Sequence, residues 1–385
     1  MDLPCFTEDF LTAAGNEFLT EGLSEKIVSA NIGAARAEEL LNWSQLSELL
    51  STRPLQPPRL RLHRDGTAIP ENTYAQPGTI AGAPVLLVRP EALYRELREG
   101  ASLVLDAIDR LHPPIRSAAD DLMRMVRERV QVNLYLLWGE THGFDVHWDD
   151  HDTFIVQVYG SKDWTIHGPG RPYPMKTDSD HDHGPPSAIA WKGTLRPGDV
   201  MHVPRGWWHY VQGTGEVSLH LTFGFTRATG IDWARAVLDR LYEQETFRRD
   251  LPRSGRSAER NRALVDGLAQ AAAELDVETF LADRDRRFPQ RHRFSLPWPV
   301  SGGTAGRAEL AGVLPPAIRP EGSTLIVEAM GKRFRFAAAA GPVLEMLVER
   351  RSVAVAELVR ETGLAEADVD AVLQVLAQQN LVLLG

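Results

Sequence analysis

The sequence contains few of the residues and segments that build sulfur-based or membrane sites. Its 385 residues include one cysteine, Cys5, and they contain no run of about 18 apolar residues that would predict a membrane-spanning helix. A single cysteine cannot form an internal disulfide or a cysteine-based zinc framework. A metal ion in this chain would therefore need ligands from histidine and carboxylate side chains.

The N-terminus lacks the features of a secretory signal. Acidic residues occur early, at Asp2, Glu8 and Asp9, and no basic start leads into an apolar core. A secretory signal needs both a basic start and an apolar core. The sequence therefore predicts a cytoplasmic protein that is not attached to a membrane.

Basic residues are outnumbered, and lysine is scarce among them. Lys and Arg total 42 against 52 Asp and Glu, which gives a formal net charge of −10. This balance argues against non-specific binding to nucleic acid and is compatible with a basic protein partner. The few lysines are Lys26, Lys162, Lys176, Lys192 and Lys332. A lysine that follows a metal-binding motif is therefore a candidate functional residue.

Length and composition predict a multidomain protein of ordinary globular character. The apolar share is 43% and the charged share is 24%, and a domain usually takes roughly 100 to 200 residues. We predict a mixed N-terminal extension over residues 1–99, a β-rich domain over 100–228, a helical region over 229–296 and a last domain over 297–385.

The first two regions differ in the period of their apolar residues. Between Asp9 and about Leu50 the spacing predicts short amphipathic helices, and Arg59 to His63 alternates like a strand. A helix is predicted at about 115–129. Several short β-rich segments separated by Gly and Pro then predict a barrel or jelly roll. These segments are QVNLYLLW, TFIVQVYG, DWTIHG, GDVMHV, HYVQG and SLHLTFGF.

The last third of the chain is predicted to be helical, with a linker and a small mixed domain. Residues 229–288 have helical periodicity and balanced charge, which indicates a solvated face and an association surface. Residues 288–306 are rich in Pro, Gly and Ser and predict a linker. A hairpin, three helices and a short strand then follow in an order that resembles a winged helix. Its third helix, about 365–379, carries acids and no Lys or Arg, so we expect no direct DNA binding.

His147 and Asp149 form an H-x-D motif that suits a metal centre. Side chains at positions i and i+2 of a strand project from the same face, so both point inward if residues 146–150 are extended. His209 is the candidate third ligand, because the segment from Gly198 places it just after a Pro-Gly turn. Two nitrogens and one carboxylate leave half of an octahedral iron open, as non-haem Fe(II) oxygenases require.

Two other interpretations of these three residues stay open. His147 and His209 could be ordinary polar strand residues, although a buried unpaired polar group costs about 1–3 kcal/mol. The site could also hold a different divalent ion or be a decayed one, because this ligand set does not by itself select iron.

Lys162 suggests a cosubstrate with two carboxylates. When 2-oxoglutarate chelates a metal through its C1 carboxylate and keto oxygen, its C5 carboxylate still needs a cation. Lys162 follows the Gly160-Ser161 turn at the start of a predicted strand and can supply that charge. Asn133 and Tyr135 share a strand face and could add an amide and a phenol. The alternative for Lys162 is a solvated lysine at a hairpin turn.

Taken together, these motifs resemble a known family. The span from about 100 to 225 resembles the Jumonji-C-type, cupin-like 2-oxoglutarate oxygenases, and within them the ribosomal protein hydroxylases. The motifs of the resemblance are N-x-Y, H-x-D fourteen residues later, G-x-K-x-W, and a GD segment that ends in histidine. They correspond here to Asn133 to Tyr135, His147 to Asp149, Gly160 to Trp164 and Gly198 to His209.

The resemblance implies a fold, a cofactor set and an oligomeric state. The implied fold is α+β, a double-stranded β-helix (jelly-roll or cupin) barrel with helical extensions, a helical dimerisation region and a C-terminal winged-helix-like domain. The implied ligands of Fe(II) are His147, Asp149 and His209. The implied 2-oxoglutarate contacts are Lys162, Asn133 and Tyr135, with a hydroxyl from Thr222 or Ser218. A homodimer is the expected assembly.

The function expected from this reasoning is a 2-oxoglutarate-dependent dioxygenase that hydroxylates a protein side chain, including one of a ribosomal protein, and releases succinate and CO2. Hydroxylation of an N-methyl carbon would instead give demethylation by the same chemistry. Two alternatives are the same chemistry on a peptide natural product or small molecule, and a catalytically inert cupin-like scaffold.

Other polar and aromatic residues are expected to be structural. The TDSDHDHG segment at 177–184 is interpreted as a solvated acidic loop that could border a substrate groove. Trp207 and Trp208 are interpreted as wall packing. The remaining histidines of this region are interpreted as strand or loop residues: His142, His151, His202 and His220.

Overall fold

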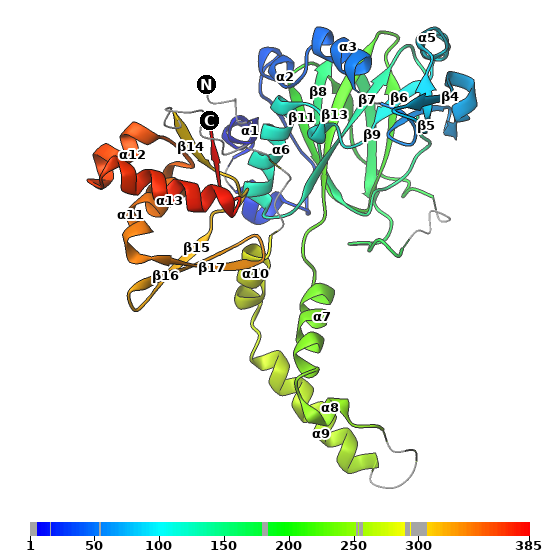
Figure 1. The fold of residues 1–385 in the computed structure, drawn as a ribbon. Helices are drawn as coiled ribbons and strands as arrows, with labels where there is room; N and C mark the ends of the chain where they lie inside the picture. Colours follow the sequence, from blue (N-terminus) through cyan, green and yellow to red (C-terminus); the bar gives the residue numbers. More distant parts are fainter. Residues whose placement is uncertain are drawn as a thin grey trace. The chain divides into compact units, whose positions relative to one another are not determined.

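The chain folds into two compact units in this computed structural model. They comprise Met1–Arg227 and Ala228–Gly385 (Figure 1), and each is described by itself. The described residues are 6–15, 17–53, 55–178, 184–251, 253, 257–288, 293 and 306–385. Cys5, most of the predicted 288–306 linker and the centre of the acidic 177–184 segment lie outside them. No helix of the described part is both long and apolar enough to cross a membrane.

Two antiparallel sheets form the centre of the first unit. The larger has the order β1-β11-β8-β13-β7-β6-β2-β3, and the smaller has the order β10-β9-β12. The large-sheet strands are β1 Val28–Asn31, β2 Leu60–Arg64, β3 Thr67–Ala68, β6 Ser102–Leu105, β7 Val130–Leu137, β8 Asp152–Tyr159, β11 Asp199–Val203 and β13 Ser218–Phe225. The small-sheet strands are β9 Lys162–Pro169, β10 Ile189–Leu195 and β12 Trp207–Gly213.

The two sheets pack face to face through apolar side chains. Ile155, Met201 and Val203 of the large sheet share one buried cluster with Trp164, Ile166 and Leu195 of the small sheet. Because strand residues alternate between faces, this cluster identifies the inner face of each strand. On β9 the inner positions are therefore 162, 164 and 166, and on β13 they are 218, 220 and 222.

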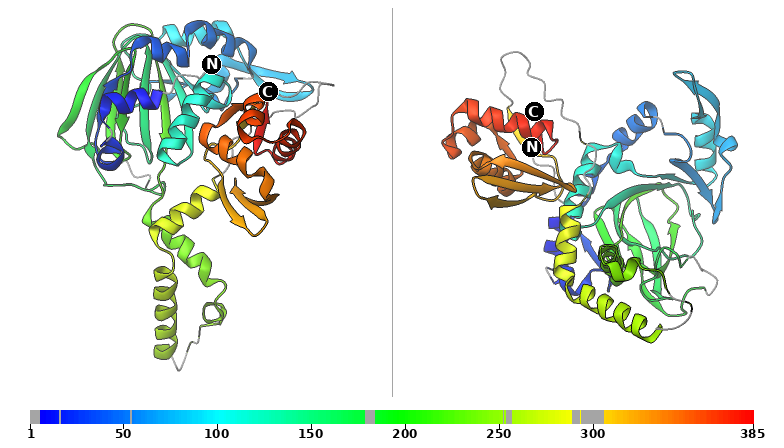
Figure 2. Two further views of the ribbon diagram at one scale, coloured as in Figure 1. Left: turned by 90° about the vertical axis from the view of Figure 1, so that its left-hand side faces the viewer. Right: turned by 60° about the horizontal axis from the view of Figure 1, so that its bottom comes forward.

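Helices cover the outer face of the large sheet (Figure 2). Phe6 and Phe10 of α1, Phe6–Ala14, contact Phe223 and Phe154 with ring centroids 4.9 and 5.1 Å apart. The other helices of this unit are η1 Phe18–Gly22, α2 Ala34–Leu40, α3 Trp43–Thr52, α4 Glu71–Tyr74, α5 Pro90–Arg98, η2 Ile108–Arg110 and α6 Pro113–Val126. A separate hairpin pairs β4 Ala75–Ile80 with β5 Ala83–Val88.

The predicted β-rich segments are confirmed as strands, with two differences. The expectation of helices alone between Asp9 and Leu50 is wrong, because β1 lies there and pairs with β11 at the edge of the large sheet. Its partner is about 170 residues away in the sequence, so no local pattern could indicate it. The structure also contains strands that were not expected, among them β10 of the small sheet and β6 of the large sheet. A mixed α+β fold is thus present, while closure of the two sheets into a barrel stays a prediction.

The second unit begins with helices and ends in a small α+β part. Its helices α7 Gly230–Leu241, α8 Glu245–Arg248, α9 Ser257–Ala273 and α10 Val277–Arg286 confirm the helical prediction. The predicted hairpin is confirmed as β16 Thr324–Ala329 paired with β17 Lys332–Ala337. The remaining elements are β14 Arg307–Leu310, β15 Ala317–Glu321, η3 Ala338–Ala340, α11 Gly341–Arg350, β18 Ser352–Ala354, α12 Val355–Thr362, α13 Glu366–Gln378 and β19 Val382–Leu384.

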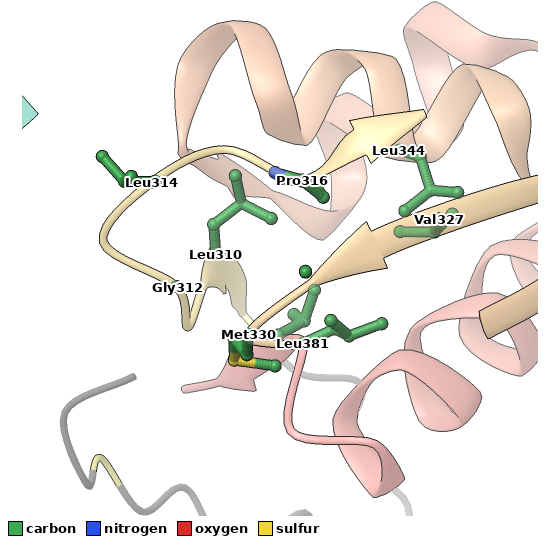
Figure 3. A pocket seen from close by; sticks show the side chains of 10 residues that line it. Leu310, Gly312, Leu314, Pro316, Val327, Met330, Leu344 and Leu381 are labelled. Atoms are coloured by element: carbon green, nitrogen blue, oxygen red, sulfur yellow. The ribbon is translucent and has the colours of Figure 1, made fainter. Parts of the chain in front are cut away.

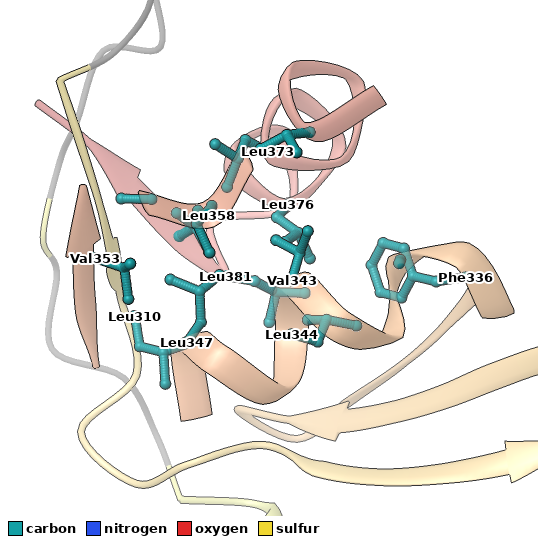
Figure 4. Close-up of a cluster of buried hydrophobic side chains, with 14 of the residues drawn as sticks. Leu310, Phe336, Val343, Leu344, Leu347, Val353, Leu358, Leu373, Leu376 and Leu381 are labelled. Atoms are coloured by element: carbon teal, nitrogen blue, oxygen red, sulfur yellow. The ribbon is translucent and has the colours of Figure 1, made fainter. Parts of the chain in front are cut away.

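A core of aliphatic side chains holds this last part together. Leu344 and Leu347 of α11 pack with Leu358 of α12 and Leu376 of α13 (Figure 4). A small apolar pocket beside this core is lined by Leu310, Leu314, Met330 and Leu381, among others (Figure 3). The three helices match the predicted ones in position, whereas the winged-helix class stays a prediction.

Candidate metal centre

Three side chains that are far apart in the sequence meet at one point of the first unit. One ligand atom each from His147, Asp149 and His209 can be chosen so that all lie within 4.8 Å of one another. The Nε2 atom of His209 lies 3.7 Å from Oδ2 of Asp149, and the rings of His147 and His209 are 4.3 Å apart between centroids. The structure therefore brings together the three residues that the sequence singled out.

Backbone hydrogen bonds fix this arrangement, although not in the predicted way. His147 and Asp149 were expected to point inward if residues 146–150 were extended; the structure has no regular strand there, and His147 precedes β8 in a loop and forms an isolated antiparallel bridge with His209. That bridge has two bonds, from His147 N to His209 O at 3.1 Å and from His209 N to His147 O at 2.7 Å. Gly206 N donates to Asp149 O at 2.8 Å. The loop thus acquires its geometry from the segment that carries the third ligand.

Both histidines present the same ring nitrogen to the centre. Nδ1 of His147 is 2.7 Å from Asp145 O, and Nδ1 of His209 is 3.1 Å from Trp207 O. A carbonyl can only accept, so the proton lies on Nδ1 in both rings and Nε2 keeps a free lone pair. This is the tautomer in which a histidine binds a metal ion through Nε2.

The protonation states also suit a metal ion. Burial, helped by the neighbouring His147, lowers the pKa of His209 to about 4, so its imidazole is neutral near pH 7. Burial by itself would raise the pKa of Asp149, but the nearby imidazoles, led by His209, outweigh it and the pKa lies below its ordinary value. The neutral imidazole of His209 and the ionised carboxylate of Asp149 can therefore bind a metal ion without losing protons.

Lys162 lies deep between the two sheets and is not a solvated turn residue. Lys162 is only 2% exposed. Its Nζ atom donates to Nδ1 of His220 at 2.9 Å and to Tyr135 O at 3.3 Å, and no carboxylate of the described residues is among its partners. Burial lowers the pKa of this ammonium to about 7. A buried cation without a counter-ion is a binding point for an anion.

His220 is the residue that the sequence reasoning missed. It was interpreted as a structural strand residue, but it occupies an inner position of β13 and accepts the hydrogen bond from Lys162. Its ring is stacked on Tyr135 at 4.9 Å. The available signal was the alternation of Ser218, His220 and Thr222, which predicts that all three share one face.

Asn133 and Tyr135 line the same interior, on β7. Tyr135 lies opposite His220 in the β7–β13 pairing. Burial, followed by the nearby Asp149 carboxylate, raises the pKa of Tyr135 to about 12, so its phenol stays protonated and can donate. Oδ1 of Asn133 already accepts from Ala107 N at 3.0 Å, which leaves its NH2 group as the part that can serve a ligand or the phenol.

The two hydroxyl candidates are placed differently. Thr222 is half-buried and lies directly opposite Asn133 on the neighbouring strand. Ser218 is completely buried, and its Oγ accepts from Nε2 of Gln157 at 2.9 Å. One lone pair of the Ser218 hydroxyl already accepts this hydrogen bond. The hydroxyl of Thr222 is therefore the better candidate for a contact with a ligand.

Three other histidines of the first unit, which were interpreted as structural, have protein partners. His142 lies 3.3 Å from Asp145, His151 lies 2.9 Å from Asp150, and His202 donates to Lys26 O at 2.9 Å. Trp208 is 3% exposed, and Trp207 packs against the cluster between the sheets. These contacts fit the structural interpretation of the five residues.

Comparison with known families identifies the domain that carries this site. Residues 110–232, which include all three clustered residues and Lys162, match the JmjC domain family. The chain therefore carries a JmjC domain, and it is related to the ribosomal oxygenases. It is 34% identical over 134 residues to human "Ribosomal oxygenase 1" and 30% identical over 177 residues to the Rattus norvegicus protein of that name. These matches cover 31% and 43% of this chain, but only 20% and 29% of the relatives.

A further relative and two solved structures are also similar to this chain. The Drosophila persimilis "Bifunctional lysine-specific demethylase and histidyl-hydroxylase NO66" is 27% identical over 165 residues, which are 43% of this chain and 21% of that protein. The Escherichia coli ribosomal oxygenase YcfD resembles this chain with a TM-score of 0.54 and 15% identity, over 96% of this chain and 98% of that one. A second structure of YcfD, in complex with cobalt and 2-oxoglutarate, has a TM-score of 0.53, 15% identity and coverage of 96% and 97%. These likenesses concern the fold.

Proposed function

We propose that this protein is an Fe(II)- and 2-oxoglutarate-dependent oxygenase that hydroxylates a side chain of a protein substrate. One observation carries the proposal: a buried lysine without a carboxylate partner among the described residues lies between the same two sheets as the His-Asp-His cluster. A metal ion bound by the His-Asp-His cluster, together with a dicarboxylate paired with Lys162, would account for both of these features. The relationship to ribosomal oxygenases supports the choice of reaction.

The donor set fits iron. His147 and His209 would bind through Nε2 and Asp149 through a carboxylate oxygen, which leaves three of six octahedral positions for other ligands. The chain holds both imidazoles in the required tautomer through the carbonyls of Asp145 and Trp207. His209 is neutral near pH 7, so its ring loses no proton when the metal binds.

The residues around Lys162 also fit 2-oxoglutarate. Lys162 would pair with the C5 carboxylate, since the ammonium retains one N–H beyond those directed at His220 and Tyr135. Asn133 and Tyr135 would contribute an amide and a phenol, and Thr222 or Ser218 a hydroxyl. The register places the inner residues of β7 and β13 opposite one another, so these groups can act on one ligand.

The chemistry belongs mainly to the cofactors. When bound, iron and 2-oxoglutarate use O2 to hydroxylate a C–H bond and release succinate and CO2. The protein binds the metal ion, anchors the cosubstrate and keeps bulk water out of an interior lined by Trp164, Ile166 and Ile155. Its phenol and ammonium groups hold protons at fixed positions near the ligand.

A protein substrate is favoured over a small molecule. The relatives are named for action on ribosomes, lysine demethylation and histidine hydroxylation, and a net charge of −10 favours encounter with a basic protein such as a ribosomal one. We further propose that the chain acts as a homodimer, for which the exposed apolar side chains of α7, α9 and α10 provide the surface.

The assignment is tested with two neighbouring carboxylates. Asp149→Asn should abolish both iron binding and 2-oxoglutarate-dependent succinate formation, because it removes the anionic ligand. Asp150→Asn, whose partner is His151, is the matched control and should retain both. His147→Ala should behave like Asp149→Asn. Turnover by His147→Ala at the parent rate would contradict the proposal.

Three further measurements on the purified protein distinguish protein hydroxylation from action on a small molecule, from demethylation and from an inert scaffold. Mass spectrometry of a candidate ribosomal protein, a peptide and a free amino acid should show a gain of one oxygen on the protein alone. Loss of a methyl group from an N-methylated protein would indicate demethylation. A protein that contains no metal after purification and reconstitution would support the inert scaffold.

A further inference from the structure

The contact between Lys162 and His220 joins the two sheets. Lys162 begins β9 of the small sheet, and His220 lies in β13 of the large sheet, 58 positions later. Lys162 is 2% exposed and His220 is 5% exposed, and Nζ of Lys162 lies 2.9 Å from Nδ1 of His220. A hydrogen bond at this distance inside an apolar interior fixes the position of the ammonium group.

The ring of His220 is itself held in one orientation. It is stacked on Tyr135 with an interplanar angle of 16° and a centroid distance of 4.9 Å, and Trp164 meets it edge-on at 5.6 Å. The charged ammonium of Lys162 can only donate, so beside it Nδ1 is the acceptor and the proton of the neutral ring lies on Nε2. Burial and the adjacent ammonium keep the pKa of His220 well below its ordinary value. His220 is therefore a rigid and neutral acceptor.

A neutral acceptor has an advantage over a carboxylate at this position. A buried carboxylate would form an ion pair with Lys162, and an incoming anion would then have to displace it or bind beside a like charge. A neutral imidazole uses one N–H of the ammonium and leaves the full positive charge for the ligand. The absence of a carboxylate partner for Lys162 among the described residues agrees with this arrangement.

We propose that His220 is a positioning residue that orients the Lys162 ammonium for the carboxylate of the cosubstrate while leaving its charge uncancelled. The proposal rests on the proposed function, since it assumes that the anion is 2-oxoglutarate. His220 acts through Lys162 and needs no contact of its own with the ligand.

Three substitutions of His220 by side chains of nearly the same shape distinguish the effect of the hydrogen-bond acceptor from the effect of its charge. His220→Asn keeps a neutral acceptor, His220→Leu removes the acceptor, and His220→Asp adds a negative charge. Each variant is loaded with Mn²⁺, and the affinity for 2-oxoglutarate is measured by isothermal titration calorimetry. The Mn²⁺ affinity without 2-oxoglutarate and the melting temperature are measured on the same samples.

The expected order of affinity is parent and Asn, then Leu, then Asp. His220→Leu should bind about 10- to 100-fold more weakly than His220→Asn, the factor that corresponds to one hydrogen bond to a charged group. His220→Asp should bind more weakly still, because it neutralises Lys162, and Mn²⁺ affinity should stay unchanged in all three. A purely structural role would instead favour Leu, the most apolar of the three. Equal affinities of the Asn and Leu variants, or an Asp variant as good as Asn, would overturn the inference.

A double-mutant cycle covers the case in which a variant is unstable. In a Lys162→Met background, His220→Leu should not weaken 2-oxoglutarate binding further, because its effect passes through the ammonium. Additive losses would contradict the proposal. If the parent protein loaded with Mn²⁺ binds no 2-oxoglutarate, the proposed function itself is wrong. If the parent binds it and the series is flat, only the role of His220 is wrong.

Discussion

Lys162 is buried, and no carboxylate of the described residues forms an ion pair with its ammonium group. Burial is the cause of its lowered pKa of about 7, so about half of the ligand-free molecules carry the ammonium at neutral pH. A carboxylate that binds beside it would favour the charged form. Binding of 2-oxoglutarate is therefore expected to be coupled to proton uptake above pH 7.

The first prediction concerns the pH dependence of this binding. Above pH 7 the affinity of the Mn²⁺-loaded protein for 2-oxoglutarate should fall, by up to about tenfold per pH unit, because Lys162 must first gain a proton. Lys162→Ala should weaken binding at every pH and leave metal content nearly intact. Lys162→Arg is the matched control, since a guanidinium keeps its charge, and its affinity should not vary between pH 7 and 9. A parent affinity that is constant over this range would contradict the assignment.

The same pKa predicts an opposite trend for the ligand-free protein. Between pH 7 and the ordinary lysine pKa of 10.5, the unfolded chain holds a proton that the folded chain has lost. The unfolded state then binds more protons, so the contribution of Lys162 to stability rises with pH in this window. Melting temperatures of the parent relative to Lys162→Met should show this increase.

At the scale of elements, the turn before β12 determines the position of Asp149. Gly206 has a φ of +79°, and a Cβ atom there would lie 2.5 Å from Cδ of Pro174. Its N–H donates to Asp149 O. A side chain at this position would therefore move the turn and, with it, the carboxylate ligand.

A pair of glycine variants tests this dependence. Gly206→Ala and Gly82→Ala should each lose about 1–2 kcal/mol of stability from the left-handed backbone conformation. Gly82 has a φ of +82° and open space within 4 Å of the position that a Cβ atom would take, and it lies in the remote β4–β5 hairpin. Gly206→Ala alone should also weaken Co²⁺ binding, measured by the absorption of the bound ion. Equal Co²⁺ affinities of the two variants would show that the turn does not position Asp149.

The H-x-D segment shows which part of the site the sequence could not predict. Its residues were expected on a strand, yet they lie in a loop whose geometry comes from the bridge between His147 and His209. The sequence was enough to single out the three residues that cluster, because ligand chemistry restricts the residue types. It does not contain the loop geometry, because the hydrogen-bond partners are 62 positions apart, from 147 to 209.

For the whole molecule, the exposed apolar side chains of the second unit suggest how copies associate. Ile231 and Leu238 of α7 are each 51% exposed, and Tyr242, which caps the C-terminal end of this helix, is 73% exposed; their spacing places them on one helical stripe. Val265 and Leu268 of α9, with Val277 and Leu281 of α10, are exposed as well. Apolar side chains grouped in this way are typical of association surfaces.

The corresponding prediction is a homodimer formed through this unit. A Leu238→Glu, Tyr242→Glu double variant should be monomeric in sedimentation equilibrium, because it places charges in the apolar stripe. Tyr94→Glu, at a 57% exposed position of α5 in the first unit, is the control and should leave the dimer intact. A parent that sediments as a monomer would contradict the prediction.

The sequence by itself determined the candidate metal ligands, the candidate anion-binding lysine and most of the strands between 130 and 225. His147, Asp149, His209 and Lys162 were identifiable as candidates because metal and carboxylate binding accept few residue types, and strands were visible because their periodicity is local. Tertiary structure alone decided that His220 faces Lys162, that β1 joins the large sheet and that no described carboxylate neutralises the buried lysine. Each of these depends on contacts between residues tens to hundreds of positions apart, and the packing of two sheets, rather than any local pattern, brings them together.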